Sequence, residues 1–256
     1  MKAIVLAAGE GSRLRPYTLE RPKCLVEVQG KSLLDRQLEV LRAEGVSDII
    51  IIGGYLSEKL EGRGSRQYHN PRYDETNMVW TLFCAEKELE GDVIVTYGDI
   101  VYSADVLKAL LADKSDISVT IDLDWEAYWR ARLENPLEDA ETLKLDSDGF
   151  VKELGQRPND LSEIEGQYMG LMKFTAIGAE ALKSVFKEAK QRRQIRGKPV
   201  ENAYMTDLLQ EMIDRGHKIK SVPVHGGWIE VDTVDDLKSG VTRSRLKIIH
   251  NSLPLK

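Results

Sequence analysis

Short, continuously apolar runs alternate with longer segments of helical period along the first half of the chain. Residues 3–8 form the first apolar run, and residues 32–44 then carry leucines at helical spacing before Gly45. The same patterns predict strands at 48–54, 92–99 and 116–123, and helices at 77–87 and 104–111. Strands that are apolar on both faces and separated by helices are typical of an α/β fold with a mostly parallel sheet flanked by helices.

The second half of the chain mixes shorter strand patterns with helices. Residues 142–158 are typical of two short strands around an Asp148-Gly149 turn. The remaining pattern predicts a strand at 168–174, helices at 179–192 and 205–215, edge-like strands at 218–227 and 228–233, and a helix from Val234. No linker or internal repeat interrupts the chain. We therefore expect one α/β domain over residues 1–256, with halves at 1–123 and 124–240, a tail at 241–256, and an antiparallel elaboration in its second half.

Composition and charge narrow the class of protein. The 256 residues are 42% hydrophobic and 30% charged, and the apolar runs are far shorter than the roughly 18 residues of a membrane span. Residues 1–9 lack the apolar core and cleavage site of a signal peptide, so we expect a cytoplasmic protein without a membrane partner. A net charge of −6 argues against a nucleic-acid partner. Two cysteines, Cys24 and Cys84, form no CxxC pair and are expected to serve packing.

The stretch "LAAGEGSRLRPYTLERPKCLVEV" carries the most informative chemistry. A buried strand ends in Gly9, Gly11 and Ser12, and the cations Arg13 and Lys23 follow. Glycines let a backbone approach a ligand closely, and successive N–H groups can form an anion-binding nest. This combination predicts a polyphosphate site at the carboxyl end of the first strand. The spacing matches neither a Walker A loop nor the GxGxxG dinucleotide fingerprint.

The same stretch closely resembles the nucleotidyltransferase signature LAAGxGxRLxPxTxxxPK. The resemblance implies a Rossmann-like fold of the nucleotidyltransferase type. It also implies that Gly9 to Arg13 wrap a triphosphate and that Lys23 stabilises charge at the attacked α-phosphorus. This stretch and the segments described below together imply a set of nucleotide-binding residues. They are Leu6, Ala7, Ala8, Gly9, Gly11, Ser12, Arg13, Lys23, Thr76, Asn77 and Gly98.

Two further segments resemble other signatures of this family. "VIVTYGDIVY" implies Asp99 as a metal ligand, and "GGWIEVDTVDDL" implies Asp232 as the second carboxylate and Trp228 over the product. Two carboxylates with phosphate oxygens suit Mg²⁺, which is the expected cofactor. Glu230 alternates with Asp232 on one strand face and is a weaker ligand candidate. The expected catalytic residues are Lys23, Arg13 and Asp99. An anionic acceptor oxygen needs no general base, and the four histidines have no motif context.

Four further segments refine the resemblance, namely "NPRYDETNMVWTLFCA", "NPLEDAETLKL", "ELGQRPNDLSEIEGQYMGLMKF" and "AYMTDLLQEMIDRG". With them, the chain most resembles small cytidylyltransferases of the phosphocholine type and their relatives. The resemblance implies transfer of CMP from CTP to a small phosphorylated or phosphonate acceptor, with release of pyrophosphate, as in cell-surface polysaccharide biosynthesis. Thr76-Asn77 would contact the nucleotide. The expected acceptor-binding residues are Tyr168, Met169, Gly170, Trp228 and Glu153.

The identity of the acceptor stays open at this point. The aromatic group Trp125, Tyr128 and Trp129 suits either helix packing or a choline cage. The charged side chains nearby would suit a zwitterionic acceptor with a carboxylate, such as phosphoglutamine, and they are Arg130, Arg132, Glu141 and Lys144. Phosphocholine and a small phosphonate remain candidates.

Two other functions compete with this interpretation. One is a sugar-1-phosphate nucleotidyltransferase using UTP, dTTP or CTP. The other is a catalytically inactive nucleotide-binding regulator, although such a protein has no need of Arg13, Lys23, Asp99 and Asp232 together. The basic run Lys187–Lys198 is typical of a solvated helix end, with a phosphate-steering rim or a subunit contact as alternatives. The family resemblance is compatible with a homodimer.

Overall fold

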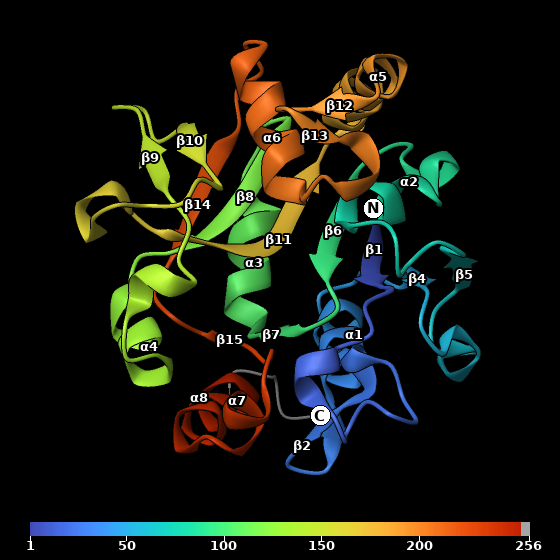
Figure 1. The fold of residues 1–256 in the computed structure, drawn as a ribbon, viewed down its shortest axis with the longest axis vertical. Helices are drawn as coiled ribbons and strands as arrows, with labels where there is room; N and C mark the ends of the chain where they lie inside the picture. The colour runs from blue at the N-terminus through green and yellow to red at the C-terminus, as the bar shows by residue number, and fades with distance from the viewer. Residues whose placement is uncertain (252–256) are drawn as a thin grey trace.

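A seven-stranded sheet forms the centre of the protein in the computed structural model, which describes residues 1–251 (Figure 1). In spatial order its strands are β14 (Lys220–Val224), β8 (Ile117–Asp122), β11 (Gln167–Phe174), β6 (Val93–Tyr97), β1 (Lys2–Ala7), β4 (Asp48–Gly53) and β5 (Arg66–His69). Neighbouring strands pair in parallel, except that β11 runs antiparallel to both β6 and β8. The prediction of a mostly parallel sheet is confirmed.

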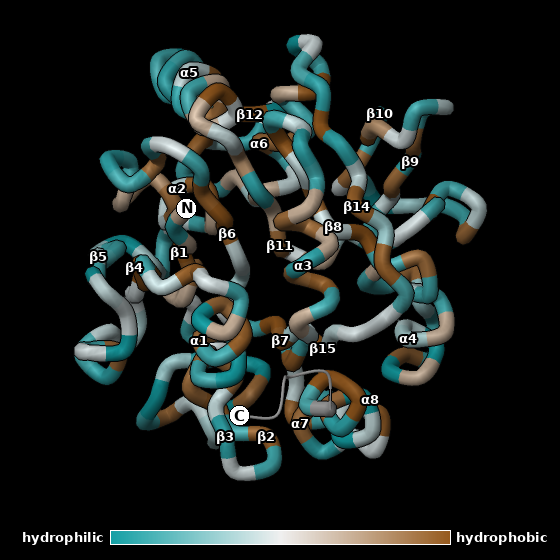
Figure 2. The backbone as a smooth tube through the Cα atoms, turned by 180° about the vertical axis from the view of Figure 1, so that it is seen from behind, coloured by the Kyte–Doolittle hydropathy of each residue, from teal (hydrophilic) through white to brown (hydrophobic). Residues whose placement is uncertain are grey.

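Both faces of this sheet are buried under helices. Along β1, Ala3, Val5 and Ala7 pack into one apolar core, and Ile4 and Leu6 into the other. Helices α1 (Leu33–Ala43), α3 (Ala104–Ala112) and α4 (Trp125–Arg132) contribute to the first core, and α2 (Met78–Phe83), α5 (Ala176–Arg192) and α6 (Met205–Asp214) to the second. Figure 2 shows the hydrophobic colour concentrated along the central strands, in agreement with their two buried faces.

Two predicted helices have different bounds in the structure. The segment predicted at 77–87 is divided into α2 and a 3₁₀ turn at Glu86–Glu88, because the backbone of Ala85 leaves the helical region between them. Helix α5 begins at Ala176, three residues before the predicted start, because the Thr175 hydroxyl accepts the N–H of Gly178 and caps the helix there.

The predicted strand at 168–174 has an unexpected place. It is β11, which lies in the middle of the main sheet between β6 and β8. The antiparallel elaboration of the second half is thus partly internal. The Asp-Gly hairpin is confirmed as β9 (Leu143–Leu145) and β10 (Val151–Leu154), and β14 is an edge strand as expected. Short ribbons also join β2 (Glu27–Val28) to β3 (Lys31–Ser32) and β12 (Gln194–Ile195) to β13 (Lys198–Pro199).

A small ribbon outside the main sheet brings distant segments together. Strand β15 (Trp228–Glu230) pairs antiparallel with β7 (Ile100–Tyr102), and the N–H of Val231 donates to the Asp99 carbonyl over 3.2 Å. Because β7 follows Asp99 and β15 precedes Asp232, this pairing places the two aspartates beside each other.

The last part of the described chain is helical. Helix α7 (Val234–Lys238) is followed by α8 (Gly240–Asn251), which takes up most of the predicted tail and buries Leu246 and Ile249. The final five residues of the predicted tail lie outside the described residues. Among residues 1–251, no helix has the length and apolarity needed to cross a membrane.

Candidate active site

The glycine loop after β1 folds back against the segment that carries Lys23. Gly11 has a φ of +65°, and a Cβ atom there would lie 2.9 Å from Cβ of Lys23. The buried Thr18 hydroxyl donates to the Gly11 carbonyl over 2.9 Å and holds the loop in this position. Gly9 instead faces open space, since a Cβ there would meet no atom within 4 Å. The two glycines therefore have different tasks, close packing at Gly11 and ligand access at Gly9.

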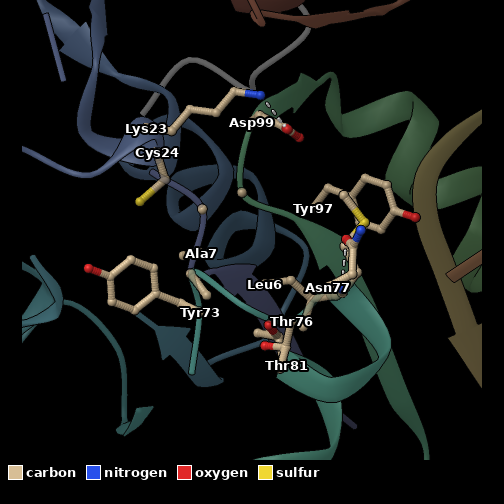
Figure 3. A pocket seen from close by; sticks show the side chains of 14 residues that line it. Leu6, Ala7, Lys23, Cys24, Tyr73, Thr76, Asn77, Thr81, Tyr97 and Asp99 are labelled. Carbon is tan, nitrogen blue, oxygen red and sulfur yellow. Dashed lines mark hydrogen bonds and ion pairs between the residues drawn. The ribbon is translucent and has the colours of Figure 1, made fainter. Parts of the chain in front are cut away.

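Two carboxylates and two cations converge beside this loop. The Lys23 ammonium donates to Asp99 Oδ2 over 2.7 Å and to Asp232 Oδ1 (the Asp99 contact is drawn in Figure 3). The Arg13 guanidinium lies 3.5 Å from Asp232 Oδ2. Residues predicted from three separate motifs thus meet at one place, the two aspartates through the pairing of β7 with β15.

The mutual contacts keep Lys23 and Asp232 charged. Burial would lower the pKa of Lys23, but Asp99 and Asp232 raise it above its usual value. Burial would likewise raise the pKa of Asp232, but Lys23 and Arg13 lower it. Opposite charges at hydrogen-bond distance favour the ionised forms of both partners.

The two aspartates have the chemistry of a divalent-cation site. Asp99 and Asp232 each place a carboxylate oxygen on the same ammonium nitrogen, so their oxygens surround a position that already holds a positive charge. Divalent cations in phosphoryl-transfer sites take one or two carboxylates together with phosphate oxygens and water. The residues therefore fit a metal of this kind.

A cavity opens next to these charges (Figure 3). Most of the predicted nucleotide-binding residues line it, and these are Leu6, Ala7, Ala8, Gly9, Lys23, Thr76, Asn77 and Gly98, together with Asp99. Gly11, Ser12 and Arg13 lie outside its wall. Of these three, Gly11 packs on Lys23, and Arg13 is largely exposed at the level of the aspartates.

The residues Thr76 and Asn77 reach the cavity at the start of α2. Asn77 Oδ1 accepts the N–H of Met78 over 2.8 Å, which caps the helix. The Thr76 hydroxyl donates to the Arg72 carbonyl over 2.6 Å and accepts from Asn70 over 2.9 Å. Both side chains are therefore held in place before any ligand binds.

Five lining residues were not among the predicted site residues of any kind. They are Cys24, Tyr73, Met78, Thr81 and Tyr97. Tyr97 directly precedes the Gly-Asp signature, which is a signal that could have indicated it. Tyr73 comes from a loop without a strand or helix pattern, so only the structure places it there. Cys24 is 2% exposed and also packs in the core, as expected.

Among the predicted acceptor residues, Tyr168 and Gly170 contact Tyr97 of the cavity wall, whereas Met169 packs in the apolar core of α1, α3 and α4, and none of the three lines the cavity itself. Tyr168, Met169 and Gly170 belong to β11, and the Tyr168 ring meets the Tyr97 ring edge-on at 5.9 Å between centroids. A Cβ atom at Gly170 would lie 2.4 Å from the Tyr97 ring, so glycine is required for this approach.

The structure does not bring Trp228 or Glu153 to this cavity. The Trp228 side chain is fully buried, and its indole N–H donates to Asp122 over 2.8 Å. It packs on Tyr128 and Trp129, so no part of the ring is exposed for the predicted contact with product. Glu153 lies on the β9–β10 hairpin, with Lys144 Nζ 3.6 Å away.

The aromatic and charged residues of α4 also have internal partners. Trp125, Tyr128 and Trp129 are core residues, so packing rather than a choline cage accounts for them. Arg130 is exposed and pairs with Glu126. Arg132 is 4% exposed and binds Glu230 and Asp236. Glu230 is thus held by Arg132, and neither arginine faces the cavity.

Glu141 is a partly buried carboxylate near Tyr97 and Tyr168. Burial, with the nearby charges of Asp207 and Asp139, raises the pKa of Glu141 to about 7. The burial of Tyr97 and Tyr168 raises their pKa values, and the charge of Glu141 adds to this effect. Glu141 is therefore close to the rings of Tyr97, in the cavity wall, and of Tyr168, on β11.

Comparison with known proteins agrees with this site. Residues 3–146 match the MobA-like NTP transferase domain, so the chain belongs to this family and is a nucleotidyltransferase. It is 39% identical over 249 residues to the CTP:phosphoglutamine cytidylyltransferase of Campylobacter jejuni, covering 93% of this chain and 98% of that protein. It is 43% identical over 99 residues to the choline-phosphate cytidylyltransferase of Streptococcus pneumoniae, covering 37% of this chain and 43% of that protein.

The fold is also found in a solved structure. The inositol-1-phosphate CTP transferase of T. maritima superposes with a TM-score of 0.76 at 21% identity, covering 96% of this chain and 95% of that one. The predicted nucleotidyltransferase fold is confirmed. Members of this family generally use a divalent metal, in agreement with the paired aspartates.

Proposed function

We propose that the protein transfers CMP from CTP to a small phosphorylated amino-acid amide, with Mg²⁺ as cofactor and pyrophosphate as the second product. The observation that carries the proposal is the convergence of Arg13, Lys23, Asp99 and Asp232 beside a cavity lined by most of the predicted nucleotide-binding residues. Relatives that act on CTP and phosphorylated acceptors support this choice, and the phosphoglutamine enzyme matches almost the whole chain.

The residues around the α-phosphate would act mainly by charge. Lys23 would neutralise negative charge that grows on the α-phosphate oxygens, and the backbone at Gly9 would approach the phosphates closely. When bound, Mg²⁺ would be held by Asp99 and Asp232 and would neutralise further phosphate charge. The acceptor oxygen is an anion at neutral pH, so the chain needs no general base.

The start of α2 supplies a reason for choosing cytosine. Because Asn77 Oδ1 already accepts the N–H of Met78, its amide can present the NH₂ group to the cavity. Cytosine N3 accepts a hydrogen bond, whereas uracil carries an N–H at that position. A donor that meets ring position 3 therefore favours CTP over UTP.

The acceptor would lie on the other side of Tyr97. Tyr168 and Gly170 border this region from β11, and Glu141 supplies a carboxylate with a raised pKa. A carboxylate in such surroundings gains most from a cationic partner. An amino-acid acceptor carries an ammonium group that can serve as this partner.

Pyrophosphate release across a panel of nucleotides and acceptors tests the proposal. The nucleotides are CTP, UTP, dTTP, ATP and GTP, and the acceptors are phosphoglutamine, phosphocholine, an aminoalkylphosphonate and glucose 1-phosphate. We expect kcat/KM with CTP to exceed that with ATP or GTP by about 100-fold or more, because a purine would overfill the site. Phosphoglutamine should be the preferred acceptor.

Other outcomes of the panel are equally informative. A preference for UTP or dTTP with glucose 1-phosphate would replace the proposal with a sugar-phosphate nucleotidyltransferase. The variant Asn77→Asp, which removes the NH₂ donor but keeps the helix-capping oxygen, should reduce the preference for CTP over UTP. Thr81→Ser, a conservative change in the same wall, serves as its control.

A further inference from the structure

We infer that Arg132 is a positioning residue that holds Asp232 in place for divalent-cation binding. Arg132 is the last residue of α4 and lies outside the cavity wall. Its guanidinium Nε donates to Asp236 Oδ1 over 2.9 Å, and its Nη2 lies 3.3 Å from Asp236 Oδ2. Its third nitrogen, Nη1, donates to Glu230. The whole planar fork is therefore used on two carboxylates that flank Asp232 in the sequence.

Asp236 in turn holds the backbone of Asp232 through hydrogen bonds. Asp236 Oδ2 accepts the N–H of Asp232 over 3.0 Å, the N–H of Thr233 over 3.0 Å and the Thr233 hydroxyl over 3.0 Å. Asp236 N–H in turn donates to the Thr233 hydroxyl over 3.1 Å. The turn that carries Asp232 is thus fixed around one carboxylate, and that carboxylate is fixed by Arg132.

The surroundings make this connection rigid. The side chains of Arg132 and Asp236 are only 4% and 7% exposed. The Arg132 guanidinium lies 5.1 Å from the Tyr128 ring centroid and 5.3 Å from that of Trp129. Those two rings pack on Trp228, which begins β15. Both ends of the segment 228–236 are consequently fastened to α4, and Asp232 lies between them.

Arg132 and Asp236 do not reach the cavity, but this arrangement gives them a role in positioning Asp232. Outer groups that orient a ligating carboxylate commonly change metal affinity by about 10–100-fold when they are removed. The β7–β15 ribbon places Asp232 near Asp99, and Arg132 limits how far the Asp232 turn can move from that position. This inference rests on the proposed metal role of Asp232.

Binding of Mn²⁺, followed by electron paramagnetic resonance in the presence of a non-hydrolysable CTP analogue, tests the inference without turnover. We expect Arg132→Lys to weaken Mn²⁺ binding by about 10-fold or more, because an ammonium cannot reproduce the fork. Arg130→Lys is the matched control, since Arg130 lies on the same helix in an exposed pair with Glu126. It should bind Mn²⁺ as the unmodified protein does.

A double-mutant cycle separates positioning from a general structural defect. If Arg132 acts through Asp232, adding Arg132→Lys to Asp232→Asn should weaken Mn²⁺ binding no further than Asp232→Asn alone. Independent, multiplicative losses in the double variant would overturn the inference. Mn²⁺ affinity in Arg132→Lys within twofold of the unmodified protein would also overturn it.

A second variant and a second readout complete the test. Should Arg132→Lys fail to fold by circular dichroism, Asp236→Asn keeps the side-chain oxygen that caps the turn but weakens its ion pair with Arg132, and it should lower Mn²⁺ affinity in the same way. Normal Mn²⁺ binding by Asp236→Asn then overturns the inference. Failure of the proposed CTP specificity would instead appear in the nucleotide panel, with Mn²⁺ binding still dependent on Arg132.

Discussion

Lys23 connects the phosphate loop to both aspartates of the site. Its stem packs against Gly11, and its ammonium contacts Asp99 and Asp232. The pairing raises its pKa, so Lys23 stays charged throughout the physiological pH range. A fixed positive charge at this position can stabilise a transition state in which charge grows on the α-phosphate.

Replacement of Lys23 should therefore affect the chemical step most. We expect Lys23→Ala to lower kcat by about 100-fold or more while changing the KM for CTP much less, because the charge interacts more strongly with the transition state than with bound substrate. Steady-state kinetics at saturating acceptor measure both constants. A loss confined to KM would show that Lys23 serves only in ground-state binding.

We expect the Glu141 carboxylate to lower the stability of the fold at neutral pH while it strengthens binding of the acceptor. Its pKa is raised to about 7, above the ordinary value of 4.5, so the folded state binds the proton more tightly than the unfolded chain does. Stability is therefore lost as the pH rises from about 4.5 to about 7. Glu141→Gln should raise the free energy of unfolding at pH 8 by about 1–2 kcal/mol, as urea denaturation would measure.

The same variant should weaken binding of the acceptor. We expect the KM for phosphoglutamine to rise with Glu141→Gln, while the KM for CTP stays nearly unchanged. Glu153→Gln is the control, since Glu153 lies on the β9–β10 hairpin. Equal acceptor KM values for Glu141→Gln and the unmodified protein would remove Glu141 from the acceptor region.

At the scale of elements, Glu88 fastens the 3₁₀ turn after α2 to the edge of the sheet. It accepts hydrogen bonds from Tyr68 and Arg66 on β5 and from Lys2 on β1. Burial alone would raise its pKa, but these donors lower the pKa of Glu88 to about 2. Charge-assisted hydrogen bonds of this kind stabilise the charged form in the folded state.

These hydrogen bonds to Glu88 should make the free energy of unfolding depend on pH in the acidic range. The contribution of Glu88 is present above about pH 4.5 and is lost as the pH falls towards 2. Glu88→Gln should lower the free energy of unfolding at pH 7 by about 1–3 kcal/mol, and the difference from the unmodified protein should shrink near pH 3. Glu86→Gln, an exposed change in the same turn, should have little effect. A constant difference across this pH range would contradict the assignment.

At the scale of the whole molecule, β11 joins the two halves of the chain. It comes from the second half but lies between β6 and β8, which both belong to the first. β8 is flanked by β11 and β14, so both of its neighbours come from beyond residue 123. The two halves distinguished in the sequence therefore share one sheet.

Residues 1–123 alone should consequently fail to fold. Without β11 and β14, β8 has no partner strand and one side of β6 is unpaired. We expect the fragment to lack native circular dichroism and dispersed amide resonances. The intact chain should unfold in urea in one transition, with coincident curves from tryptophan fluorescence and far-ultraviolet circular dichroism. A folded fragment would contradict this prediction and show that residues 1–123 form a unit of their own.

Local patterns in the sequence determined the order of strands and helices and the phosphate loop. Apolar period and the LAAGxGxRL stretch act over a few residues, so the strand at residues 3–8, the helix at residues 32–44 and the loop at Gly9 could be predicted without knowledge of their surroundings. The bounds of α2 and α5 were less predictable, since single backbone angles and caps decide where a helix ends or begins.

Tertiary structure alone decided which of the candidate residues meet. Asp99 and Asp232 are adjacent because β7 pairs with β15, and β11 lies inside the main sheet because its apolar faces are covered there. An indole or a guanidinium can pack internally or face a ligand, and its sequence context is compatible with both. Trp228 and Arg132 are internal because long-range contacts with Asp122 and Asp236 satisfy their polar groups, and such contacts exist only once distant segments have come together.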